Sequence, residues 1–204
     1  SGLVGSEMCI RDSYEKSIKY MIYGDILRNG TYPISVSSER IFQAIAIIEY
    51  AKSVGADCVA HGSTGAGNDQ VRFDLTFQVL APEIEIITPT RDMTLTREYE
   101  INYLREHGFE ADFKKMEYSI NKGLWGTSIG GKETLRSEQT LPEEAYPSQV
   151  TAHAEERLKI TFHEGEIAAV NGKPYADKVE AIRAVEAIGS KFGIGRDMHI
   201  GDTI

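Results

Sequence analysis

The sequence has few cysteines, fewer basic than acidic residues, and no long apolar run. Each of these shortages excludes a class of protein. Its 204 residues contain two cysteines, which cannot build a disulfide framework or a cysteine-rich zinc site. Acidic residues outnumber basic ones by 31 to 22, so nucleic acid or an anionic membrane is not expected as the main partner. No apolar run approaches the ~20 residues of a membrane span. We expect a cytoplasmic protein.

The first thirteen residues, Ser1 to Ser13, show neither a helical nor a strand period. They resemble translated sequencing-adapter read-through, and the alternatives are a short disordered tail or a cloning scar. A signal peptide is not expected, because no basic segment precedes a long apolar one. We expect the sequence proper to begin at about Tyr14.

The most informative stretch, called here the signature segment, is residues 61–73: His-Gly-Ser-Thr-Gly-Ala-Gly-Asn-Asp-Gln-Val-Arg-Phe. It joins a predicted buried strand, residues 56–60, to a predicted packed helix, residues 69–80. Glycines let the backbone approach a ligand closely, and Asn68 is a favourable helix N-cap. Since helix N-termini attract anions, the arrangement indicates a phosphate or carboxylate site.

Neither the P-loop pattern nor the dinucleotide fingerprint fits the spacing of the three glycines. The pattern H-G-x-T-G-x-G-N-D-Q-V-R-F instead resembles the substrate loop of the argininosuccinate synthase family. Further stretches that resemble this family follow in order between Tyr14 and Ile204: residues 31–37, 117–119, 168–172 and 193–196.

The resemblance implies a carbon–nitrogen ligase that joins citrulline to aspartate at the expense of ATP, in arginine biosynthesis or the urea cycle. In this family the ureido oxygen of citrulline attacks the α-phosphate of ATP, and the aspartate amine then displaces AMP from the citrullyl-adenylate. The resemblance also implies Mg²⁺ with the ATP and a homotetrameric parent protein. No dedicated metal cluster is visible in the sequence.

The resemblance assigns Thr64, Asn68 and Asp69 to the aspartate substrate. The chemistry fits, because hydroxyl and amide donors suit its two carboxylates and the Asp69 carboxylate suits its ammonium. Asn68 and Arg72 are assigned to citrulline, and the Arg72 fork suits a carboxylate. The plainer alternative is that Asn68 caps the helix, Asp69 favours its dipole and Arg72 makes a surface ion pair.

The family's further citrulline contacts correspond to Tyr32, Ser37, Ser119 and Ser128, and its ATP contact in this segment corresponds to Gly62. Plainer roles compete here as well. Ser37 or Ser38 is a suitable N-cap for a helix over residues 39–54, and a serine in a glycine-rich stretch is often a turn residue. His61 is interpreted as a structural residue at the end of a strand, and Trp125 is interpreted as a packing residue.

Helices and strands alternate in the pattern typical of an α/β protein. We expect residues 14–115 to be part of a parallel-sheet, Rossmann-like adenine-nucleotide-binding domain of the ATP pyrophosphatase type, and residues 116–204 to be part of an α+β synthetase domain. The remaining predicted helices span residues 14–27, 96–107 and 176–189, and the remaining strands span residues 83–88, 158–162 and 167–170. Cys58 is expected to be an inert, buried thiol.

Some family features are not found. Gly201, followed by Asp202, stands where many members have a citrulline-binding glutamate, and neither the ATP loop Ser-Gly-Gly-x-Asp-Thr-Ser nor the tetramer-forming C-terminal helix is present. These departures predict an internal fragment that is inactive alone. Two other interpretations stay open: another ATP-pyrophosphatase-type amide or thio synthetase, and a short non-catalytic amino-acid-binding protein.

Overall fold

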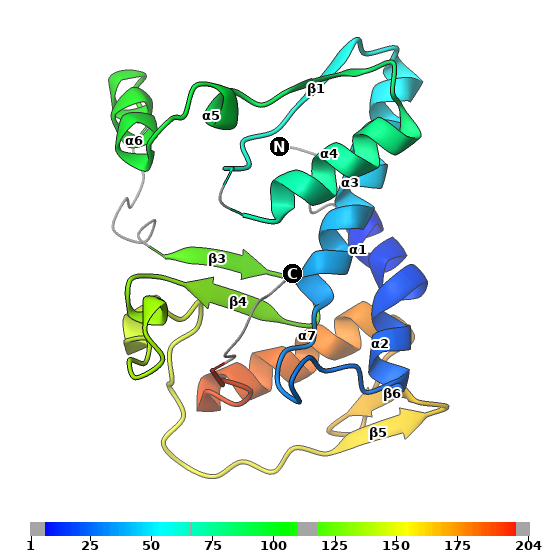
Figure 1. Ribbon diagram of the computed structural model, residues 1–204. Helices are drawn as coiled ribbons and strands as arrows, with labels where there is room; N and C mark the ends of the chain where they lie inside the picture. The colour runs from blue at the N-terminus through cyan, green and yellow to red at the C-terminus, as the bar shows by residue number, and fades with distance from the viewer. Residues whose placement is uncertain (1–6, 66, 110–117, 199–204) are drawn as a thin grey trace. The chain divides into compact units, whose positions relative to one another are not determined.

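The computed structural model describes residues 7–65, 67–109 and 118–198 (Figure 1). Within this range, residues 7–9 and 37–109 form one compact unit, and residues 10–36 and 118–198 form a second. The α-helices are α1 Glu7–Ser13, α2 Lys19–Tyr23, α3 Ser35–Val54, α4 Asp69–Leu80, α5 Pro89–Asp92, α6 Arg97–Glu106 and α7 Lys178–Gly189. The strands are β1 Cys58–Ala60, β2 Glu85–Ile87, β3 Ser119–Lys122, β4 Thr127–Gly130, β5 Ile160–His163, β6 Glu166–Val170 and β7 Lys173–Pro174.

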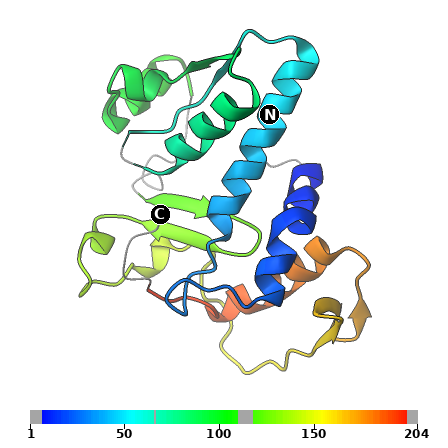
Figure 2. The ribbon, with the colours of Figure 1, turned by 45° about the vertical axis from the view of Figure 1, so that its right-hand side comes forward.

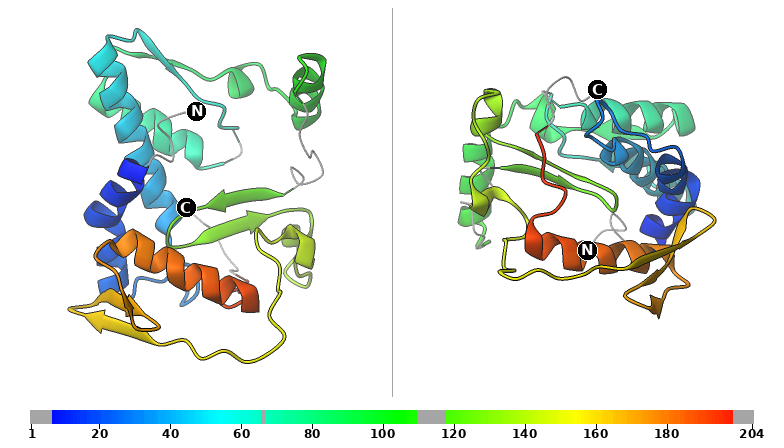
Figure 3. Two further views of the ribbon diagram at one scale, coloured as in Figure 1. Left: turned by 180° about the vertical axis from the view of Figure 1, so that it is seen from behind. Right: turned by 90° about the horizontal axis from the view of Figure 1, so that it is seen from below.

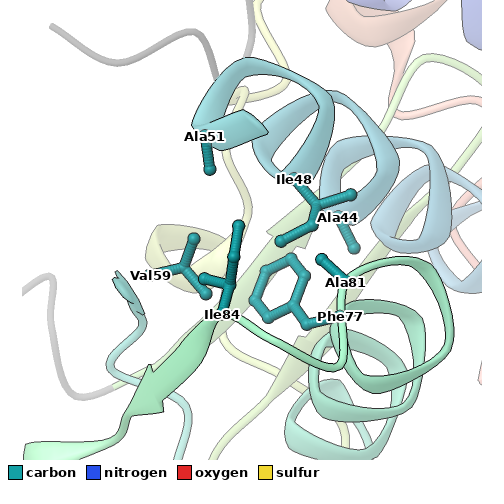
Figure 4. Packing of buried hydrophobic residues seen from close by; sticks show 7 residues of the cluster. All are labelled: Ala44, Ile48, Ala51, Val59, Phe77, Ala81 and Ile84. Carbon is teal, nitrogen blue, oxygen red and sulfur yellow. The ribbon is translucent and has the colours of Figure 1, made fainter. Parts of the chain in front are cut away.

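The first unit contains a parallel strand pair with a crossover helix. β1 and β2 pair with Val59 opposite Ile86, and α4 connects them. The α3 and α4 helices pack against this pair, with the Phe77 ring lying between Ile48 and the strand side chains (Figures 2 and 4). The expected α/β character with parallel strands is therefore confirmed, and the helices bury one face of the strand pair.

Cys58 does not have the predicted environment. Side chains alternate between the two faces of a strand, and Val59 takes the face that packs against the helices. Cys58 consequently points to the opposite face, where its free thiol is exposed. The prediction of a buried thiol was wrong because an apolar stretch of three strand residues still has two faces.

The α4 helix is also less buried than its apolar content suggested. Phe77 is buried, but Val71, Leu75 and Val79 are each more than half exposed. These three residues recur every four positions and so form one stripe on the helix, away from the core. The stripe that contains Phe77 packs in the first unit, and Thr76 beside it is also buried.

Helix boundaries differ from the predicted ones at three places. Residues Glu7–Ser13 are helical, so the predicted lack of regular structure there was wrong for this part, and residues 1–6 lie outside the described range. A π-helical turn, Tyr14–Ile18, leads into α2, which ends at Tyr23 rather than Leu27, with Gly24 as C-cap. The α3 helix begins at Ser35, which places Ser37 inside its first turn instead of at its N-cap.

The second unit contains two antiparallel sheets and the α7 helix (Figure 3). The β5–β6 hairpin has the predicted position, and its turn residues Glu164 and Gly165 both have positive φ, as tight hairpin turns require. The β3–β4 hairpin was not predicted. A buried cluster joins Tyr14 and Ile18 to α7, and Trp125 packs against it as expected. The Tyr14 hydroxyl donates a hydrogen bond to Glu166 in β6 (2.6 Å).

By their contacts, residues 14–36 group with the second unit. The predicted domains, residues 14–115 and 116–204, stay a prediction. The predicted boundary at residues 115 and 116 lies outside the described range. Among the helices that the structure describes, none is both long and apolar enough to cross a bilayer.

Candidate functional site

The signature segment begins at the carboxyl end of β1. His61, its first residue, donates a backbone hydrogen bond to Ile87 at the end of β2 (3.1 Å), so residues 88–92 leave the neighbouring strand at the same edge. Ligands of open parallel sheets bind beyond this edge. The segment thus has the position that the sequence predicted for a site.

The glycines of the signature segment are not required by the fold. Gly62, Gly65 and Gly67 all have φ values that L-residues adopt. A Cβ atom added at Gly62 would lie 3.6 Å from its nearest neighbour, Thr90 Oγ1, and one at Gly65 would lie 3.9 Å from Arg91 Cγ. At Gly67 it would meet nothing within 4 Å. Among the described residues, neither backbone strain nor packing therefore excludes a side chain at these three positions.

The side chains of Thr64 and Asn68 have polar groups available for a ligand. Thr64 is exposed and Asn68 half-buried. Although Asn68 directly precedes α4, it is in the helical conformation and its side chain makes no capping hydrogen bond. The interpretation of Asn68 as a plain N-cap therefore finds no support in the structure.

Asp69, Arg72 and Ser37 form a connected polar group. The Arg72 guanidinium donates to Asp69 Oδ1 (2.6 Å) and to Ser37 Oγ (2.8 Å). Arg40, on α3, lies 3.4 Å from Asp69 Oδ2. The two guanidiniums and one carboxylate leave this cluster with one net positive charge, which favours anionic ligands.

Arg40 was missed from the sequence. It follows Ser37 by three residues, and positions three apart in a helix share a face. The spacing of Ser37 and Arg40 becomes informative only once α3 is known to include Ser37. With the helix started at residue 39, Ser37 and Arg40 would not have been placed on one helical face.

A second polar group lies beside the first half of the segment. His61 Nε2 contacts Asp74 Oδ1 (2.7 Å), and the backbone N–H of Ser63 donates to His61 Nδ1 (3.3 Å). Arg91 donates to Asp74 Oδ2 (2.6 Å) and to Gln70 Oε1 (3.2 Å). A structural role was expected for His61 at the end of a strand, and its contacts agree with that role.

Burial alone would raise the pKa of Asp74, but the hydrogen bonds from Arg91 and His61 outweigh it and hold that pKa below the usual range. The hydrogen bond to Asp74 correspondingly raises the pKa of Arg91. Asp74 is therefore an ionised partner for both neighbours at neutral pH.

In the second unit, the β3–β4 register brings two predicted citrulline contacts together. Ser119 pairs with Gly130, and Asn121 pairs with Ser128. These pairs are two residues apart, so Ser119 and Ser128 lie on one face of the hairpin as diagonal neighbours. Tyr32 lies in the turn closed by backbone pairing between Arg28 and Tyr32.

Comparison with known proteins now gives the family. The family model described as "Arginosuccinate synthase N-terminal HUP domain" matches residues 4–110, a range that contains the whole signature segment. The chain belongs to the argininosuccinate synthase family. The HUP description agrees with the parallel strand pair and crossover helix of the first unit.

Three relatives in this family show how much of the chain is matched. The chain is 40% identical over 199 residues to the argininosuccinate synthase of Methanocaldococcus jannaschii, covering 95% of the chain and 50% of the relative. It is 38% identical to that of Saccharolobus solfataricus over 96% of the chain and 50% of the relative. For the Parasynechococcus marenigrum enzyme the identity is 39%, over 86% of the chain and 44% of the relative. The chain thus spans about half the length of these relatives.

The matched range begins at residue 4, inside the segment Ser1 to Ser13, which was predicted to precede the sequence proper. Arg11 in that segment is paired with Asp177 (2.7 Å), at the N-cap of α7. At the other end, Gly201 and Asp202 lie outside the described residues.

Proposed function

We propose that this chain supplies the amino-acid site of an argininosuccinate synthase, the enzyme that joins citrulline to aspartate with cleavage of ATP to AMP and pyrophosphate. The observation that carries the proposal is the arrangement of Thr64, Asn68, Asp69 and Arg72 at the carboxyl end of β1, beside glycines that the fold does not need.

In this proposal aspartate binds to Thr64, Asn68 and Asp69. The Asp69 carboxylate accepts from two guanidiniums, yet an ionised carboxylate has about four acceptor positions. It can therefore accept from the substrate ammonium as well. Thr64 and Asn68 donate to the substrate carboxylates, and the net positive charge of the cluster favours them.

Citrulline binds to Asn68, Arg72 and Ser37 in the first unit. Two N–H groups of Arg72 are used by Asp69 and Ser37, and a guanidinium has five. The others are suited to the citrulline carboxylate. Tyr32, Ser119 and Ser128, in the second unit, stay predicted citrulline contacts.

ATP approaches the backbone at Gly62, where the lack of a side chain allows close contact. Within residues 7–65, 67–109 and 118–198, no group of three His, Cys, Asp or Glu residues could hold a metal ion. Asp69, the carboxylate nearest the proposed substrates, is held by arginines, so these residues do not fit a resident Mg²⁺. Any Mg²⁺ would enter on the ATP phosphates, as is usual for this ion.

The test is a graft into a full-length relative. In the M. jannaschii enzyme, this chain replaces the matched segment, and argininosuccinate and AMP are measured with and without each substrate. We expect product that requires citrulline, aspartate and ATP together. In the same graft, Asp69→Asn should abolish product without lowering the melting temperature, whereas Arg136→Ala, an exposed arginine of the second unit, should change neither.

AMP release without any requirement for citrulline would contradict the proposal and indicate a different ATP-dependent synthetase. Calorimetry on the 204-residue chain alone, titrated with aspartate and citrulline without ATP, examines the amino-acid-binding alternative. Assaying the chain alone for AMP also tests the sequence-based prediction that it is inactive.

A further inference from the structure

The signature segment is anchored at two points by residues to which the family comparison assigns no role. At its start, Ser63 N–H donates to His61 Nδ1, and His61 Nε2 meets Asp74 Oδ1 (2.7 Å). In its middle, the Gln70 side-chain amide donates to the carbonyl oxygen of Gly65 (2.7 Å). Both anchors lie within four residues of Thr64 or Asn68, so they fix the backbone that carries the proposed aspartate contacts.

Arg91 joins the two anchors. Its Nη1 donates to Asp74 Oδ2 (2.6 Å) and to Gln70 Oε1 (3.2 Å), so one guanidinium orients both side chains. The Nη2 group donates to Thr88 Oγ1 (2.9 Å), and Thr88 in turn donates to Asp92 (2.7 Å). Thr88 is fully buried at the end of β2, so its hydroxyl is a fixed acceptor that holds the Arg91 side chain in place.

The hydrogen-bond pattern also defines the state of His61. Because Nδ1 accepts from Ser63, the proton of the neutral ring lies on Nε2, where it is donated to Asp74. The ring is only 9% exposed and stacks on Phe73 with centroids 5.6 Å apart. The packing and the carboxylate together hold one tautomer and one ring orientation.

We propose that Arg91 and Asp74 are positioning residues for the aspartate site: Asp74 acts through His61 on Ser63, and Arg91 acts through Gln70 on Gly65. Their functional role rests on the proposed function. The Arg91 guanidinium is already surrounded by Asp74, Gln70, Thr88 and Asp92, so it shapes the loop instead of binding substrate.

The loop geometry is tested by NMR on the 204-residue chain. Arg91→Ala and Asp74→Asn should each speed hydrogen exchange of the Ser63 amide at least tenfold. Both should also move the imidazole ¹⁵N signals of His61 from the Nε2–H tautomer towards an average of the two tautomers. Arg105→Ala, an exposed arginine on α6, is the matched control and should leave both signals unchanged.

The functional part is tested by titrating aspartate into the same variants of the M. jannaschii graft. Arg91→Ala should weaken aspartate binding about tenfold, and Gln70→Ala should weaken it less because only the Gly65 anchor is lost. Gln70→Ala removes a surface amide, so it remains a test if Arg91→Ala lowers the melting temperature. Unchanged Ser63 exchange and unchanged affinity in these variants would overturn the inference.

Asp69→Asn separates the two proposals. It should abolish aspartate binding while leaving Ser63 exchange as in the unmodified chain. If Asp69→Asn has no effect on binding, the proposed function fails, whatever the loop variants do. If Asp69→Asn abolishes binding and Arg91→Ala alters neither exchange nor affinity, only the positioning role fails.

Discussion

Glycines occur in both the signature segment and the β3–β4 region of the second unit, residues 118–131, but their surroundings differ. In the signature segment an added Cβ would meet nothing closer than 3.6 Å. At Gly126 it would lie 2.7 Å from Pro33 Cγ, and at Gly131 it would lie 2.6 Å from the Tyr118 ring. Gly126 and Gly131 are needed for packing, whereas Gly130, where an added Cβ would lie 3.9 Å from Thr134 Oγ1, and the glycines of the signature segment are not. We propose that the signature-segment glycines serve a ligand, while Gly126 and Gly131 serve the fold.

The strongest effect should be on binding through the signature segment. Arg72→Ala removes a guanidinium that should make charge-assisted hydrogen bonds to citrulline, each contributing roughly 1.5–3 kcal/mol. We expect citrulline affinity to fall about 100-fold, since roughly 1.4 kcal/mol corresponds to a factor of ten. Titration calorimetry on the graft measures this change. Retained affinity in Arg72→Ala would remove Arg72 from the citrulline site.

The next effect concerns stability in the β3–β4 region. Gly126→Ala forces a methyl group against the rigid Pro33 ring, and overpacking of this kind costs about 1–3 kcal/mol. The free energy of unfolding from urea titration should fall by that amount. An unchanged value would mean that Gly126 is not required by packing and would remove the contrast between the two regions.

Gly67→Ala is the matched change in the signature segment. Its φ is compatible with alanine and nothing lies within 4 Å of the new methyl group. Replacing glycine at such a position stabilises by about 0.4–1 kcal/mol, because the unfolded chain loses freedom. In urea titrations, Gly67→Ala should therefore raise the free energy of unfolding, whereas Gly126→Ala should lower it. A loss of stability comparable to that in Gly126→Ala would contradict the distinction between the two sets of glycines.

Much of the first unit could be predicted from the sequence, because its signals are local. The strand, glycine loop and helix around Gly62 follow from residue types over one short stretch. The α6 helix begins within one residue of its predicted start, and Thr96 caps it by accepting from the Tyr99 amide. Asp177 likewise caps α7. Capping residues and turns act within a few positions, so a single sequence contains them.

The missed features depend on contacts between distant residues. The β3 and β4 strands carry polar residues on both faces, so their sequence lacks a strand period, and the hairpin is defined by pairing across the turn. Arg91 reaches Asp74 and Arg40 reaches Asp69 across 17 and 29 positions. No local pattern indicates such pairs. The exposure of Cys58 was missed because strand faces were not assigned.

The pH dependence of stability, which arises from Asp74 beside the signature segment, is expected to be a smaller effect. The pKa of Asp74 is lower in the folded chain than its usual value because Arg91 and His61 bond to it despite burial. Its stabilising contribution is therefore complete above the unfolded pKa of about 3.9 and is lost as the pH falls through the lower folded pKa. Urea titrations of the unmodified chain and Asp74→Asn should differ near neutral pH and converge in acid. A constant difference at all pH values would contradict this linkage.

The weakest effect should be at the exposed face of β1. Cys58→Ala should change the free energy of unfolding by less than about 0.5 kcal/mol, as surface changes do. Val59→Ala, one residue along on the buried face, should cost about 2 kcal/mol. Cys58 should also react with a maleimide in the folded chain. Protection of this thiol would show that the face is covered.

The glycines of the signature segment are interpreted above as present for a ligand and not for the fold. Gly62→Ala in the M. jannaschii graft is the sharpest test of that interpretation, with the melting temperature and the dependence of product formation on ATP concentration measured on the same sample. We expect an unchanged or slightly higher melting temperature together with a large loss of ATP-dependent product formation. A lowered melting temperature, or full activity with alanine at this position, would contradict it.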